Sequence, residues 1–128
     1  MKRNILTVPI HQVNEGTDTP AQDLVAVEDP LQIRLAGLLA GRALRVRMLG
    51  SAAIDLAWLA SGRHHASVTL CNRPWDMAAG VVIAREAGAT VTDLDRSEYS
   101  LDSRSVIAAA GRLGPELMAI VEEAQRRA

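Results

Sequence analysis

The chain has 128 residues, of which 48% are apolar, and a formal net charge of −1 at pH 7. This length and composition suit a single domain with one core, and a near-neutral charge without basic clusters argues against binding of nucleic acid. The single cysteine, Cys71, cannot form an internal disulfide, and no signal peptide or apolar run of spanning length is found, which predicts a cytoplasmic protein that does not enter a membrane.

The first part of the chain gives three signals of secondary structure. Residues 1–28 alternate weakly and then become polar, which predicts an edge strand followed by a loop, separate from a domain over residues 29–128. Asp29 and Pro30, a cap followed by a first-turn proline, predict a helix over 30–41. Alternation over 44–48 predicts a half-buried strand.

The remaining elements are expected in the order helix, strand, helix, strand, strand, helix. They are predicted over about 54–62, 66–70, 74–87, 90–92, 106–109 and 117–124. Asn72 and Pro74 offer a cap and an early proline for the middle helix, and Gly88 is its expected end. Strands alternating with helices at this spacing predict an α/β layer structure with right-handed crossovers.

Two features suggest a functional site. Asp76 lies in the predicted first turn of a helix, where backbone N–H groups and the macrodipole favour a carboxylate, so helix stabilisation alone can explain it. The run Gly50-Ser51-Ala52-Ala53 joins a strand to a helix. Its exposed N–H groups suit an anion or a substrate hydroxyl, and a tight turn of small residues explains the run equally well.

A longer motif decides between these interpretations. It reads Pro74-Trp75-Asp76-Met77-Ala78-Ala79-Gly80 and continues as a helix to Glu86-Ala87-Gly88. The motif resembles the carboxy-terminal signature of the inositol monophosphatase family, and the resemblance extends over roughly residues 42–128, with 1–41 matching loosely. It implies a layered α-β-α fold with a mixed, mainly parallel sheet, corresponding to the carboxy-terminal half of the family's αβαβα sandwich.

The same resemblance implies an activity, a cofactor and site residues. The activity is the magnesium-dependent hydrolysis of a sugar or polyol phosphate monoester. Asp76 would bind Mg²⁺ and help to orient the attacking water, and Gly50, Ser51 and Ala52 would lie beside the substrate ring. Thr69 stands where family members commonly carry a glutamate that contacts substrate hydroxyls, and it cannot offer the same pair of acceptors. Inositol phosphate specificity is therefore not implied; another sugar or polyol phosphate, or no substrate, fits as well.

The upstream part of the family's metal site is missing. Family members carry an upstream glutamate and an Asp-Pro-x-Asp-Gly-[Ser/Thr] motif, whereas Glu28-Asp29-Pro30-Leu31 lacks the second aspartate and the glycine, and predicts only a helix cap. Metal-assisted phosphoryl transfer needs several carboxylates, so activity is expected to require the missing half. The alternative hypothesis is a non-catalytic, truncated homologue that binds a ligand or partner as a dimer, through the surface that the missing half would cover.

Three rival motifs are weaker. Asp93-Leu94-Asp95 resembles the nucleophile loop of haloacid dehalogenase-type phosphatases, but its late position and the absence of a following lysine favour an acidic turn. Cys71 has no arginine six residues on, which excludes a cysteine-phosphatase loop. His64 and His65 are adjacent on a predicted strand edge, would point to opposite faces and are expected at the surface.

Overall fold

The computed structural model describes residues 5–7, 30–43, 45–47 and 51–126. The strands are β1 (Ile5–Thr7), β2 (Arg45–Arg47), β3 (Ala66–Thr69), β4 (Thr90–Thr92) and β5 (Val106–Ala109). The helices are α2 (Pro30–Arg42), α3 (Ala52–Ala60), α4 (Pro74–Glu86) and α5 (Gly114–Arg126), with a short 3₁₀ helix, η1 (Gly111–Leu113), before α5. This order confirms the predicted alternation of strands and helices.

The described strands form one mixed sheet in the order β2-β1-β3-β5-β4. β1 pairs parallel with both β2 and β3, whereas β5 pairs antiparallel with both β3 and β4. β1 to β4 therefore share one direction and β5 alone runs the other way. The mixed sheet was predicted, but its pairings are divided equally, so the expectation of a mainly parallel sheet is not confirmed.

The position of β1 differs from the prediction. β1 was expected at an edge, yet it lies between β2 and β3. Both neighbours come from later in the sequence, so the weak alternation of a short amino-terminal strand carries no information about where it pairs. The edges are formed instead by β2 and β4.

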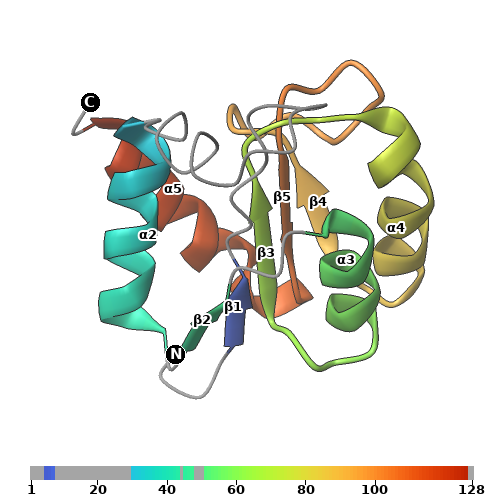
Figure 1. Ribbon diagram of the computed structural model, residues 1–128, viewed down its shortest axis with the longest axis horizontal. Helices are drawn as coiled ribbons and strands as arrows, with labels where there is room; N and C mark the ends of the chain where they lie inside the picture. The colour runs from blue at the N-terminus through green and yellow to red at the C-terminus, as the bar shows by residue number, and fades with distance from the viewer. Residues whose placement is uncertain (1–4, 8–29, 44, 48–50, 127–128) are drawn as a thin grey trace, which may run out of the picture.

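Helices cover both faces of the sheet, as the predicted α-β-α layers require. Figure 1 shows α2 and α5 on one side and α3 and α4 on the other. Successive residues of a strand point to opposite faces, and β5 follows this rule: Ile107 packs in the core beneath α2 and α5, whereas Val106 and Ala108 pack in the core beneath α3 and α4.

The packing of α3 against α4 depends on Gly80. A Cβ atom added there would lie 2.8 Å from Leu56 Cδ1 and 2.9 Å from Leu56 Cβ. Real Cβ atoms do not approach neighbours so closely, because the repulsion would push the helices apart. The absence of a side chain at residue 80 therefore lets the two helices lie close together over the sheet.

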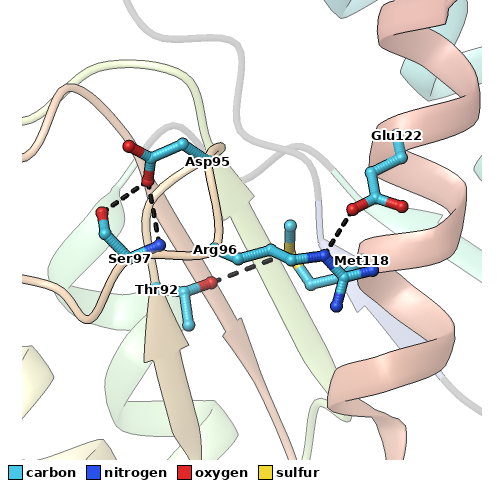
Figure 2. A network of polar contacts seen from close by, with 6 residues as sticks. All are labelled: Thr92, Asp95, Arg96, Ser97, Met118 and Glu122. Atoms are coloured by element: carbon cyan, nitrogen blue, oxygen red, sulfur yellow. Dashed lines mark hydrogen bonds and ion pairs between the residues drawn. The ribbon is translucent and has the colours of Figure 1, made fainter.

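Polar contacts join the β4 edge of the sheet, and the turn after it, to α5, as Figure 2 shows. Thr92 Oγ1 donates to Met118 Sδ at 3.7 Å, and Arg96 Nε donates to the Glu122 carboxylate. Arg96 adopts a φ of 70° in the turn that follows β4. Beyond the turn, Glu98 forms a single antiparallel bridge to Thr92, so the chain covers part of the outer edge of β4 with its own backbone.

None of the described helices has both the length and the apolar character needed to cross a membrane.

Candidate functional site

The candidate site residues gather at one edge of the sheet. β1 to β4 run in the same direction, so the loops that leave them emerge at a common edge, here called the carboxyl edge. It carries Ser51 at the start of α3, Thr69 at the end of β3, Asp76 at the start of α4 and Asp93 after β4. In open α/β sheets ligands bind outside the carboxyl ends of the strands. Ser51, Thr69 and Asp76 therefore lie on the side of the sheet where such folds bind ligands.

Asp76 lies in the first turn of α4 and is exposed. Pro74 occupies the start of the helix, as predicted, and the backbone N–H of Asp76 donates to the carbonyl of Arg73 at 2.8 Å. The helix has no side-chain cap, because its N-cap residue is Arg73 and not the predicted Asn72. The Asp76 carboxylate is thus accessible to solvent at a helix N-terminus, where negative charge is favoured.

Ser51 is the N-cap of α3. Its Oγ accepts a hydrogen bond from the backbone N–H of Ile54 at 3.4 Å, so the predicted turn of small residues also caps the helix. Ala52 is buried in the first turn, and Gly50 lies outside the described residues. Their proposed contact with a substrate ring stays a prediction.

Thr69 lies at the end of β3 and is 2% exposed. It pairs in register with Val106, whose side chain belongs to the core beneath α3 and α4. Residues directly opposite one another in an antiparallel pair point to the same face, so Thr69 faces this helix layer. Its role in substrate specificity stays a prediction.

The described residues do not form a complete metal site. Among them, no group of three or more His, Cys, Asp or Glu side chains lies close enough to hold a metal ion. Asp76 can supply one carboxylate oxygen, the kind of ligand that Mg²⁺ prefers, but a magnesium site needs further ligands.

Asp93 holds the loop that follows β4. Its carboxylate accepts hydrogen bonds from the N–H groups of Leu94 at 2.7 Å, Arg104 at 2.9 Å and Ser105 at 3.1 Å, and from Ser105 Oγ. Burial acts to raise the pKa of Asp93, but the hydrogen bonds outweigh it and lower that pKa. A carboxylate engaged in this way supports the predicted acidic turn.

Asn72 has a role that sequence reasoning missed. Its Nδ2 donates to the carbonyl of Ser103 at 2.7 Å, and its Oδ1 accepts from the Tyr99 hydroxyl at 3.0 Å. These bonds tie the segment before α4 to the loop after β4. No local pattern predicts these bonds, because they join residues about thirty positions apart.

Asp55 is a second functional candidate that was missed. It lies in the first turn of α3, is 0% exposed, and neither carboxyl oxygen has a hydrogen-bond partner among the described residues. Burial raises the pKa of Asp55 to about 6. A signal was available in the sequence, because Asp55 is spaced three and four residues from the buried apolar Ala52 and Leu59.

His64 is buried, so the expectation of a surface histidine is wrong. Its ring packs edge-on against Trp58, with the ring centroids 5.4 Å apart, and it is 4% exposed. The N–H groups of Arg63 and His64 both donate to the carbonyl of Trp58, and this turn brings the ring back to the helix. Burial, and then the charge of His65, lower the pKa of His64.

The sequence model of the inositol monophosphatase family matches residues 8–126. The chain belongs to the inositol monophosphatase family. The match starts well before residue 42 and so extends further toward the amino terminus than the motifs had suggested.

Two members of the family are similar to part of the chain. It is 41% identical over 78 residues to the inositol-1-monophosphatase ImpA of Mycolicibacterium smegmatis, covering 61% of this chain and 28% of that protein. It is 40% identical over 82 residues to the fructose-1,6-bisphosphatase/inositol-1-monophosphatase of Thermotoga maritima, covering 64% of this chain and 32% of the relative.

A solved IMPase from Thermotoga maritima superposes with a TM-score of 0.79 at 26% identity, covering 99% of this chain and 43% of that one. The chain therefore has the fold of part of this family and spans less than half the length of each of these relatives.

Proposed function

We propose that the chain supplies the carboxy-terminal part of a magnesium-dependent phosphatase site for a sugar or polyol phosphate monoester. The observation that carries this proposal is the exposed Asp76 at the start of α4, within the family's Trp-Asp motif and at the carboxyl edge. The names of the relatives support the substrate class, since they include an inositol-1-monophosphatase and a fructose-1,6-bisphosphatase/inositol-1-monophosphatase.

In this proposal, Asp76 and the turn before α3 have different tasks. Asp76 gives Mg²⁺ one carboxylate ligand and orients water, and the Gly50, Ser51 and Ala52 turn borders the substrate. When bound, the metal supplies positive charge that stabilises the phosphoryl group. One carboxylate does not hold the ion, so the remaining ligands are expected from the part of the family's site that this chain does not span. The chain by itself is expected to be inactive.

A chimera tests the proposal. The matching 43% of the Thermotoga maritima IMPase is replaced by this chain, and hydrolysis of inositol and fructose phosphates is measured with Mg²⁺. We expect turnover that Asp76→Asn lowers by at least about a hundredfold. Asp102→Asn, which removes another exposed carboxylate, should leave the rate unchanged. Equal effects of the two substitutions would show that Asp76 has no special role.

A second candidate function, a non-catalytic binding dimer, is favoured by the outer surface of α3 and α4. Of the seven exposed large apolar side chains among the described residues, five lie on these helices. They are Ile54, Trp58, Trp75, Val82 and Ile83. Exposed apolar side chains that gather on one layer of a protein mark a candidate interaction site. A chain that forms a tight dimer in sedimentation, while the chimera shows no turnover, would favour this function over the first.

A further inference from the structure

Asp55 is a buried acid for which the proposed phosphatase site has no use. It is 0% exposed and lies on the inner side of α3, on the same helix face as the buried Ala52 and Leu59. Neither of its carboxyl oxygens accepts or donates a hydrogen bond within the described part of the chain. An ionised carboxylate in such surroundings loses its hydration and gains nothing in return, whereas a protonated acid loses far less.

No described charged side chain bonds to Asp55 from the elements around it. β3, which packs beneath α3, contributes only Ala66 to Thr69, with no ionisable side chain. On α4, Asp76 and Glu86 are exposed, and Arg85 is bonded to the carbonyl of Tyr99.

The other charged groups near α3 are also accounted for. Arg47 of the edge strand β2 is exposed, and His64 and His65 lie past the opposite end of the helix. The Arg63 guanidinium lies over the Trp58 ring, and Arg73, the N-cap of α4, makes no hydrogen bond to Asp55.

Asp93, unlike Asp55, is an aspartate that the fold surrounds with hydrogen-bond donors. Asp93 receives three backbone N–H groups and one hydroxyl, so its ionised form is the one that the fold stabilises. Asp55 receives none. The fold therefore favours the ionised form of Asp93 and the protonated form of Asp55.

We propose that the protonation state of Asp55 controls the packing of α3: while the acid is protonated α3 packs tightly on the sheet, and loss of the proton loosens the helix. The backbone N–H of Asp55 donates to the carbonyl of Ser51 at 3.0 Å, so the loosening reaches the N-cap turn. Control of ligand affinity at that turn rests on the proposed function, whereas the loosening of α3 does not.

The sign of the effect follows from the two protonation states. Burial raises the pKa of Asp55 from 3.8 to about 6, so its contribution to stability is complete below about pH 4 and is lost as the pH rises to about 6. His64 acts in the opposite direction, because its lowered pKa costs stability as the pH falls below 6.5. A measurement local to each residue is therefore needed.

The first test is a carbon-13 NMR titration of the Asp55 side-chain carboxyl in the unmodified chain. We expect a midpoint well above that of Asp95, an exposed aspartate whose carboxylate accepts bonds from Ser97. The second test is hydrogen exchange at about pH 5 and about pH 7.5, corrected for intrinsic rates. From about pH 5 to about pH 7.5, the protection of the backbone amides of residues 52–60 should fall by about tenfold or more relative to those of α5.

Variants give the matched comparison. Asp55→Asn removes the charge, so the pH-dependent loss of α3 protection should disappear, whereas Asp95→Asn should retain it. A midpoint near 4 for Asp55 would overturn the proposal, and so would equal protection changes in α3 and α5. If Asp55→Asn fails to fold, the titration of the unmodified chain still decides, and neither measurement depends on phosphatase activity.

Discussion

For single residues, the number of hydrogen-bond donors around a carboxylate determines whether the fold stabilises its ionised form. Asp93 accepts bonds from both ends of the loop that it closes, since Leu94 follows it directly and Arg104 and Ser105 lie eleven and twelve residues further on. The Asp93 carboxylate therefore holds the two ends of this irregular loop together, as backbone hydrogen bonds do between paired strands. This loop in turn contacts Asn72, just before the helix that carries Asp76.

Replacing Asp93 by Ala should lower the free energy of unfolding by about 2 to 4 kcal/mol, because three N–H groups and a hydroxyl lose a charged acceptor. Urea denaturation at neutral pH measures this loss. The matched control, Asp95→Ala, removes an exposed carboxylate that accepts bonds from Ser97 in the same turn and should cost much less.

The pH dependence supplies a second check on Asp93. Its pKa lies below the ordinary value of 3.8, so its contribution is present above about pH 4 and is lost as the pH falls below that value. The unmodified chain should lose stability in this range more steeply than Asp93→Ala does. Parallel curves would contradict the role given to the hydrogen bonds.

At the scale of elements, the contact between α3 and α4 sets how the two helix N-termini meet at the carboxyl edge. Gly80 makes this contact possible, because Leu56 already fills the space that a side chain would need. The intrinsic preference of the helix works the other way, since alanine stabilises a helix interior by about 1 kcal/mol relative to glycine. A substitution at residue 80 sets the two effects against each other.

Gly80→Ala should destabilise the protein by about 1 to 3 kcal/mol, because overpacking against Leu56 outweighs the helix preference. Gly37→Ala in α2 is the control, since nothing lies within 4 Å of a Cβ added there. It should be neutral or stabilise by up to about 1 kcal/mol. The free energy of unfolding in urea separates the two, and a stabilised Gly80→Ala would show that the helices do not depend on this approach.

Local signals predicted the elements well. Pro74 marks the start of α4, and Gly88, with a φ of 93°, follows its end, so both bounds were close to the prediction. The strands at Thr90–Thr92 and Val106–Ala109 occur where they were expected. Caps, glycine and alternation act over a few residues, which is why a sequence reveals them.

Pairing and burial could not be predicted in the same way. The interior position of β1 and the insertion of β5 between β3 and β4 depend on partners far along the chain. The same holds for His64, which is buried with its ring packed on Trp58. In the candidate site, family resemblance supplied Asp76, whereas Asn72 became visible only through its contacts across the fold.

At the scale of the whole molecule, the two helix layers present different surfaces. The α2 and α5 layer carries charge, including the ion pair between Arg42 and Glu123 at 2.6 Å. The α3 and α4 layer instead exposes Trp58, Val82 and Ile83. Asp76 lies at the end of this apolar layer. A partner that covered the α3 and α4 layer would therefore also come close to the proposed site.

Val82 and Ile33 test which layer associates, because each is 59% exposed, the first on α4 and the second on α2. Val82→Glu should weaken self-association of the chain by about tenfold or more, since a charge would be buried in the contact. Ile33→Glu should leave it unchanged. Sedimentation velocity over a range of concentrations measures both, and equal effects would show that the α3 and α4 surface is not the contact.

The reversed direction of β5 also constrains the order in which the sheet is assembled. β4 is synthesised before β5 but has no strand to join until β5 has formed beside β3. A ribosome must therefore complete almost the whole domain before its fourth strand gains a neighbour. Until then, the growing polypeptide carries an unpaired segment that is open to association with other chains.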